Sequence, residues 1–372
     1  MIPYFILMLV PLFFQVGLKF SNISICIGKK RKKVTADNIA LPMFFFLFLL
    51  ILVLRDDTIG RDLSNYNIIF NAIGNGELFQ SYYDVREPVF QIYNWFVYNF
   101  ISNNFQVFIA ITAMITVIPI AIVYCKDKSL GYMKMTIFVN ISTFIMLFSG
   151  IRQGIAMALG ILGYQALKER KTFRYIIFAM LATFTHHTGF MTFFLLPLYR
   201  FRFRKIDLFW IIPVAGVVIV FNNRIFNSLA TFMVNFDEKY AAVADSTGAI
   251  WAFVLFLLFT VFCYIITDDS QMDDEAFALR NILMFATIIQ SFASLNPLAM
   301  RMNYYFILLI PMAVGKCLTF VDYKYAQVAK VGEIVICVFF TALFLYNTYI
   351  SYITGVSALD TIPYVPFWKG SN

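Results

Sequence analysis

Long apolar runs, each ended by a short polar or basic segment, recur along the whole chain. The run "LPMFFFLFLLILVL" at 41–54 is typical, and it leads directly into the charged stretch "LRDDTIGRDLSNY" at 54–66. A helix needs about 20 apolar residues to cross a hydrocarbon core about 30 Å thick. The pattern therefore predicts an all-α, polytopic transmembrane bundle of about 12 to 13 membrane segments. The predicted segments are 2–19, 39–54, 105–124, 134–149, 151–167, 172–185, 188–199, 207–221, 249–267, 277–297, 303–320 and 331–349.

Several of these segments are too short to cross the membrane upright. We therefore expect short or re-entrant helices, whose polar ends are tolerated in the membrane only where protein or a water-filled cavity covers them. The stretch 88–102, "PVFQIYNWFVYNFIS", has an amphipathic aromatic pattern that favours an interfacial or re-entrant segment. The run 2–19 lacks a basic start and a small-residue cleavage site, so we interpret it as a retained helix.

Composition supports a membrane protein, because 61% of the 372 residues are hydrophobic, 13% are charged and the mean hydropathy is +0.76. Soluble domains have roughly 45–50% apolar and about 25% charged residues. The five cysteines form no CxxC pair and there are only two histidines, so we expect no zinc site. Neither a Walker A loop nor a GxGxxG motif is present, and we expect no nucleotide, metal or other cofactor.

The net charge of +8 fits the positive-inside rule better than a nucleic-acid partner. Basic clusters such as "GKKRKK" at 28–33 and "YRFRFRK" at 199–205 are expected in the cytoplasm. This orientation puts two long loops, about 55–87 and 222–248, on the extracytoplasmic side. With no internal repeat and no separate soluble domain in view, residues 1–372 are predicted to form a single integral membrane domain.

Under this topology, polar residues from four separated segments reach the outer face. The segments are the loop at 55–87, "SGIRQGIAMALG" at 149–160, "FTHHTGF" at 184–190 and "NPLAMRMNYY" at 296–305. A charge at the bilayer centre costs about 2.5–3.5 kcal/mol, so charges delivered to one leaflet predict a shared polar cavity. The candidate site residues are Arg55, Arg61, Asp62, Tyr66, Glu87, Arg152, Gln153, His186, His187, Arg301 and Tyr304.

These residue types suit an anionic lipid-linked substrate, because the planar guanidinium of arginine matches phosphate and carboxylate. A nearby base could add proton transfer, and Asp62, Glu87 and His186 are equal candidates for it. Purely structural roles stay open for each residue. Arg152 could close a helical hairpin, and Arg301 could pair with a carboxylate. Arg55 and Arg61 could be interfacial anchors, and the two tyrosines could belong to an interface belt. The histidines could be packed and hydrogen-bonded.

At these residues the chain resembles the EpsG family, Wzy-like polysaccharide polymerases of bacterial capsule, O-antigen and exopolysaccharide pathways. The similarity spans roughly residues 40–320. Many members have Gly-Thr-Asp where this chain has Gly60-Arg61-Asp62, and the doubled histidine leaves open which one matches the family's single position. The resemblance rests on R-x4-G-x-D-x3-Y (Arg55 to Tyr66), Glu87, "IRQGIAMAL" (151–159), "ATFTHHTGF" (182–190) and R-x2-Y (Arg301 to Tyr304).

The resemblance implies a multi-pass enzyme of the bacterial cytoplasmic (inner) membrane whose active site faces the periplasm or the exterior. Such an enzyme transfers a growing glycan from undecaprenyl diphosphate to a lipid-linked repeat unit, without nucleotide or metal. The expected partners are the undecaprenyl-diphosphate-linked donor and acceptor, membrane lipid and, by analogy, a chain-length regulator and the flippase of the same pathway. We expect Arg152 and Arg301, assisted by Arg55, to stabilise the leaving diphosphate.

The expected roles divide into two groups. A catalytic role is expected for Glu87, Asp62, His186 and Arg152. Substrate binding is expected for the other candidates, Arg55, Arg61, Tyr66, Gln153, His187, Arg301 and Tyr304.

Other functions fit the pattern less well. A flippase or transporter should show inverted repeats and helices broken at mid-membrane. An O-antigen ligase-type glycosyltransferase would attach the glycan to a different acceptor without lengthening it. A membrane acyltransferase is a weaker alternative, because its support is limited to a histidine in a helical hairpin.

Overall fold

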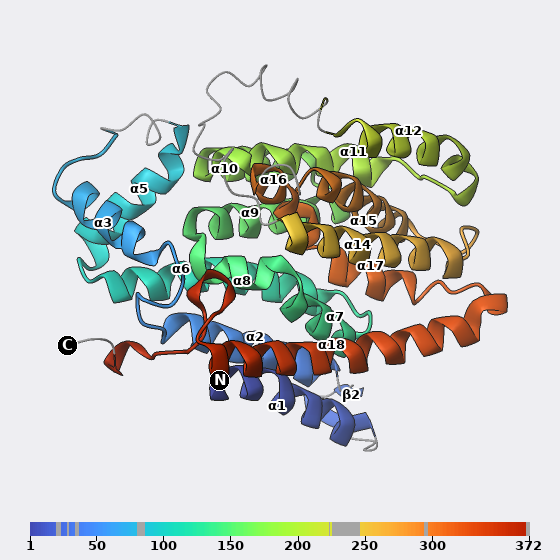
Figure 1. The fold of residues 1–372 in the computed structure, drawn as a ribbon, viewed down its shortest axis with the longest axis horizontal. Coiled ribbons are helices and arrows are strands. Elements are labelled where there is room, and N and C mark those ends of the chain that lie inside the picture. The colour runs from blue at the N-terminus through green and yellow to red at the C-terminus, as the bar shows by residue number, and fades with distance from the viewer. Residues whose placement is uncertain are drawn as a thin grey trace. The chain divides into compact units, whose positions relative to one another are not determined.

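The computed structural model describes residues 1–19, 24–27, 30–33, 37–79, 86–222, 224, 246–293 and 297–369 (Figure 1). These residues are almost entirely helical, and the only regular strands among them are β1 (Ser24–Ile27) and β2 (Lys30–Lys33), which pair antiparallel. The chain divides into two compact units, one of Met1–Phe190 with Glu333–Asn372 and one of Met191–Gly332.

In the first unit, α6 packs against both α2 and α9, and α9 packs against α10. Its centre is aromatic: the ring of Phe48 lies 5.0 Å from that of Phe144, and Phe44 lies 5.9 Å from Phe138. Near one end of the unit, α3 and α5 lie side by side (Figure 1). The elements are α1 Ile2–Lys19, α2 Asp37–Val53, α3 Leu63–Gly74, α5 Pro88–Phe96, the π-helix η1 Val97–Ile101, α6 Phe105–Lys126, α7 Gly131–Asn140, α8 Ser142–Ser149, α9 Ile151–Lys168, α10 Thr172–Thr185, most of α18 Ala326–Thr354 and the 3-10 helices η6 Ala358–Asp360 and η7 Phe367–Lys369.

Four described helices are long and apolar enough to cross a membrane: Phe105–Lys126, Ala249–Ile266, Asp274–Ala293 and Tyr323–Thr354. A fifth crossing results if the bent pair α7 and α8 forms one span. The helices over most of the other predicted segments are shorter or more polar. The molecule is a polytopic helical membrane protein, as the apolar runs predicted.

The segment 134–149, predicted as one span, is two helices that meet at 62°. The side chain of Asn140 donates to the carbonyls of Thr136 and Phe340, and Ile141 is extended with ψ 151°. The polar side chain thus holds the break through a contact with a residue 200 positions away.

In the second unit, α15 packs against α11, α14, α16 and α17. Arg280 is completely buried on α15, where its guanidinium lies 4.2 Å from the ring centre of Tyr264 and donates to Asp269 at 2.6 Å. These partners offset the cost of a charge inside an otherwise apolar span. The predicted loop 222–248 lies largely outside the described residues. The elements of this unit are α11 Leu195–Arg200, η3 Lys205–Asp207, α12 Leu208–Val220, α14 Ser246–Ile266, α15 Asp274–Ala293, α16 Pro297–Ile307, α17 Ile310–Cys317 and η5 Tyr323–Tyr325; the 3-10 helix η2 His187–Phe194 leads into it from the first unit.

Candidate active site

The charged loop after α2 docks onto the chain segment where α8 ends and α9 begins. Arg55 is buried, and its Nη1 donates to the carbonyl of Phe148 at 2.6 Å. The backbone N–H of Asp62 donates to Ser149 Oγ at 3.1 Å, and the Ser149 hydroxyl donates to Asp62 Oδ2 at 2.8 Å. The motif from Arg55 to Tyr66 and the segment 149–160 that contains Arg152 are therefore in contact.

Gly60 allows this docking. Its φ is +116°, a conformation that residues with a side chain rarely adopt, and a Cβ built on it would lie 2.2 Å from the carbonyl oxygen of Phe148. Only glycine lets the two backbones approach this closely. The glycine of the R-x4-G-x-D pattern is thus explained by backbone geometry.

The C-terminal segment holds the same loop from the other side. The N–H of Asp56 donates to Val365, the N–H of Phe367 donates to Leu54, and the N–H of Gly60 donates to Asp360. The Arg61 side chain forms an exposed ion pair of 3.1 Å with Asp360. The loop is therefore pinned between the end of α8 and residues 359–367.

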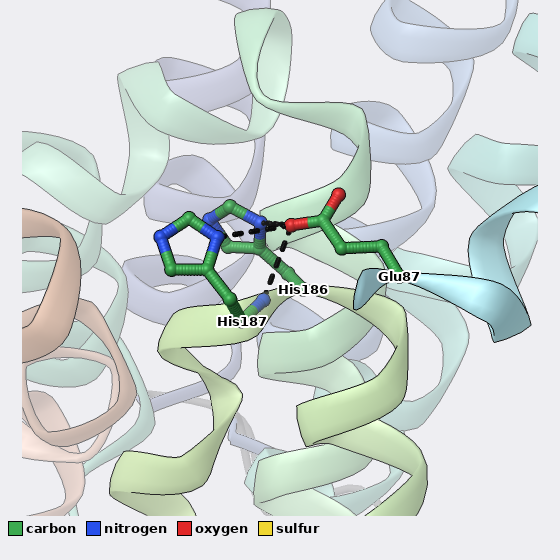
Figure 2. Close-up of side chains that lie close together, drawn as sticks. All are labelled: Glu87, His186 and His187. Atoms are coloured by element: carbon green, nitrogen blue, oxygen red, sulfur yellow. Dashed lines mark hydrogen bonds and ion pairs between the residues drawn. The ribbon is translucent and has the colours of Figure 1, made fainter. Parts of the chain in front are cut away.

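Glu87 is the centre of a cluster that joins three separated segments. It is 3% exposed and immediately precedes Pro88, which suits the first turn of α5. One carboxylate oxygen, Oε2, accepts from Arg152 Nη1 at 2.6 Å. The other, Oε1, lies 2.6 Å from Nδ1 of His186 and 3.1 Å from both Nδ1 and the backbone nitrogen of His187 (Figure 2).

Two aromatic rings hold the guanidinium of Arg152 in place. Its carbon lies 5.6 Å from the ring centre of Tyr66 and 5.8 Å from that of Phe90. Nε also points at the Tyr66 hydroxyl oxygen at 3.4 Å. Both rings belong to a buried apolar cluster shared by α3, α5, α6 and α9. Arg152 is consequently oriented before any ligand arrives, while 29% of its side chain is still exposed.

A tight turn aims both histidines at Glu87. His186 ends α10 with an extended backbone (φ −150°, ψ 129°), and the N–H of Gly189 donates to the His186 carbonyl at 2.7 Å. A Cβ on Gly189 would lie 2.2 Å from the carbonyl oxygen of Ala182. The glycine in "HHTGF" therefore lets the chain fold back on α10. In this turn His186 is buried, whereas the His187 side chain is 46% exposed.

The charges of Glu87 and Arg152 balance each other in the cluster. Burial alone raises the pKa of Glu87, but hydrogen bonds from His186 and His187 and the charge of Arg152 outweigh it and hold that pKa well below its usual range. Burial lowers the pKa of His186 to about 4, against the opposing effect of Glu87. Both groups lie between helices, not within a membrane-spanning helix. At neutral pH the cluster thus holds a carboxylate, a guanidinium and a neutral His186 imidazole.

The model of the EpsG family matches residues 38–365, which is most of the chain and includes Glu87, Arg152 and both histidines. The chain belongs to the EpsG family. The family comprises Wzy-like polysaccharide polymerases. No curated protein and no solved structure matches the chain.

In this EpsG protein, five of the predicted site residues come together: Tyr66, Glu87, Arg152, His186 and His187. Three others, Arg55, Arg61 and Asp62, hold the neighbouring loop, which gives each of them a structural contact. Their predicted roles in substrate binding and catalysis stay predictions.

The remaining three predicted residues are placed as follows. Gln153 is buried on α9 next to Arg152. Arg301 and Tyr304 belong to α16 in the second unit, where Tyr304 is buried.

Sequence reasoning gave no role to Phe90, Ser149 or Asp360. A signal was present for two of them, because Phe90 follows the Glu87-Pro88 helix start and Ser149 directly precedes Gly150 at the start of the arginine motif. Asp360 carried none, because its contact with Arg61 joins residues 299 positions apart.

Glu87, His186 and His187 are also the residues that could hold a metal ion, since one ligand atom from each lies within 4.8 Å of the others. Arg152 sits on the same carboxylate at 2.6 Å, and its positive charge disfavours a second cation there. The arrangement favours acid–base chemistry and anion binding over metal binding.

Proposed function

We propose that this EpsG protein polymerises undecaprenyl-diphosphate-linked oligosaccharide repeat units at the extracytoplasmic face of the bacterial cytoplasmic membrane. It transfers the glycan from the lipid diphosphate donor to a lipid-linked acceptor. Membership of a polysaccharide polymerase family supports the polymerisation. The observation that carries the finer proposal is the oriented, partly exposed Arg152 beside a carboxylate and two imidazoles.

Arg152 is suited to a diphosphate leaving group. Among the described residues, Glu87 and Tyr66 accept from its Nη1 and Nε, which leaves Nη2 for a ligand. As the glycosidic bond breaks, negative charge grows on the departing diphosphate. A fixed guanidinium binds that charge more strongly in the transition state than in the ground state, which lowers the barrier.

Glu87 keeps this guanidinium in place. Its buried carboxylate and the rings of Tyr66 and Phe90 hold Arg152 before the donor binds, so little reorganisation is needed during the reaction. Arg301 and Arg55 remain the further predicted contacts to the diphosphate. Nothing in this scheme uses a nucleotide or a metal ion, because the energy of the transfer resides in the lipid diphosphate.

A purified-protein assay tests the proposal. The protein in liposomes is given undecaprenyl-diphosphate repeat units extracted from the host, and the products are separated by glycan length. We expect a ladder of lengths, and a rate about 10²- to 10³-fold lower for Arg152→Ala, the usual effect of removing one charge-stabilising donor. Arg174→Ala removes an exposed arginine of α10 and is the matched control.

Two outcomes would replace the proposal. Movement of single repeat units across the liposome membrane without lengthening indicates a flippase. Transfer of one glycan to a different acceptor, again without a ladder, indicates a ligase. If Arg152→Ala leaves the yield of the ladder unchanged, the polymerase function holds but Arg152 does not take part in the reaction.

A further inference from the structure

One buried nitrogen of the cluster has no hydrogen-bond partner within the described part of the chain. Nε2 of His186 is buried and contacts no donor or acceptor among the residues that the structure describes. Buried polar atoms in proteins are nearly always hydrogen-bonded, and the exceptions frequently mark catalytic groups or ligand contacts. Because only 7% of the side chain is exposed, bulk water does not supply the missing partner.

Glu87 determines which nitrogen of His186 carries the proton. An ionised carboxylate can only accept hydrogen bonds, and its Oε1 lies 2.6 Å from Nδ1. The neutral imidazole therefore has its hydrogen on Nδ1 and its lone pair on Nε2. The unpartnered nitrogen is thus the basic one, and the neutral ring that burial favours is the form that can take up a proton.

The other candidate bases are already engaged. Glu87 accepts from Arg152 with one oxygen and from both histidines with the other. Asp62 accepts from the Ser149 hydroxyl in the contact that docks the loop. His187 has the longer contact to Glu87, 3.1 Å, and its half-exposed ring is open to water.

Given the polymerase function proposed above, on which this inference rests, we propose that Nε2 of His186 is the general base that deprotonates the acceptor sugar hydroxyl, with Glu87 as its positioning residue. The hydroxyl proton moves to Nε2 while the hydroxyl oxygen bonds to the anomeric carbon of the donor. The bond from that carbon to the diphosphate oxygen breaks, and its electron pair leaves with the lipid diphosphate. His186 later returns the proton to the released diphosphate.

The groups that face His186 support this step. The negative charge of Glu87 stabilises the imidazolium that forms, as the carboxylate does in a Ser-His-Asp triad. Arg152 and His187 are the other titratable neighbours, and both also interact with that carboxylate. Burial above all, and also the charge of Arg152, oppose a resting positive charge on His186, so the ring returns to its neutral form after each transfer.

The experiment compares the two adjacent histidines in the liposome assay, with host repeat units as the substrate. His186→Ala and His186→Gln should lower kcat about 10²- to 10⁴-fold, the usual contribution of a general base, with KM changed less than about threefold. His187→Ala should lower kcat less than about tenfold, because the base is retained. Added imidazole should restore part of the His186→Ala rate and leave the His187→Ala rate unchanged.

The results separate this inference from the polymerase function. If wild-type protein forms a ladder and the His186→Ala rate is within threefold of wild type, His186 is not the general base, and the polymerase function still holds. A missing wild-type ladder overturns the polymerase itself. If neither His186 variant is monodisperse after purification, the His187→Ala enzyme decides, since His186 is then the only histidine of the chain. Its kcat should fall about tenfold per pH unit on the acid side of one pKa, and a kcat independent of pH would overturn the assignment.

Discussion

Gly60 packs closely against the end of α8, and Gly60→Ala tests whether this contact assembles the site. Two effects act together. A side chain at φ +116° is strained by about 1–3 kcal/mol. A Cβ 2.2 Å from the Phe148 carbonyl oxygen forces the backbones apart, and overpacking of this kind costs about 1–3 kcal/mol. We expect the free energy of unfolding to fall by about 2–6 kcal/mol.

Gly76→Ala is the matched control. Gly76 also has a positive φ, +101°, but a Cβ there meets nothing within 4 Å. It should lose only the strain term, about 1–3 kcal/mol. Both variants would be unfolded reversibly in mixed detergent micelles and assayed for glycan lengthening. Because Gly60 positions Asp62 against Ser149, Gly60→Ala should also lower the polymerisation rate, whereas Gly76→Ala should not. Equal losses of stability in the two variants would refute the close-approach argument.

Three further predictions concern the contacts of the cluster and of the 54–61 loop. Glu87→Ala leaves the largely buried guanidinium of Arg152 without its carboxylate and should reduce the free energy of unfolding by about 2–4 kcal/mol. Asp360→Ala breaks only the exposed ion pair with Arg61 and should change this free energy by less than about 1 kcal/mol in the same detergent unfolding assay. Deletion of residues 357–372 removes the backbone hydrogen bonds to the 54–61 loop and should be far more damaging than Asp360→Ala; equal thermal stability of the two proteins would contradict this. His186 has a pKa of about 4 when folded, below the usual value near 6.5, so its contribution to stability is complete above about pH 6.5 and is lost as the pH falls toward 4. His186→Gln should lack this part of the pH dependence when its free energy of unfolding and that of the wild type are measured as a function of pH.

The fold class was predictable from local pattern, because a run such as 105–124 is apolar all round and forms the helix α6 at almost the same bounds. The break at Asn140 was not predictable, since it depends on a carbonyl that lies 200 residues further along the chain. The buried Arg280 was visible as a charge within an apolar run, but its partners Tyr264 and Asp269 are known only from the packing of α14 and α15.

For the site, motif order predicted which residues matter but not what each one contacts. Glu87 and Arg152 were named from the sequence as separate features, and their ion pair joins positions 65 residues apart. Arg55 and Arg152 are the same residue type, and each lies close to a helix end, Arg55 after the end of α2 and Arg152 at the start of α9. One is buried against a backbone carbonyl and the other stays partly open to a ligand. That difference depends on how α3, α5 and α9 pack, which spacing does not encode.

The contact between residues 359–367 and the 54–61 loop has a consequence for biosynthesis. A ribosome makes the chain from its N-terminus, so the loop is complete long before residues 359–367 exist. Until they emerge, the N–H groups of Asp56, Gly60 and Arg61 lack their partners in the finished fold. Contacts this distant in sequence form late, because a long stretch of chain must first be ordered. The hydrogen bonds that hold the 54–61 loop are therefore completed only after residues 359–367 have been synthesised.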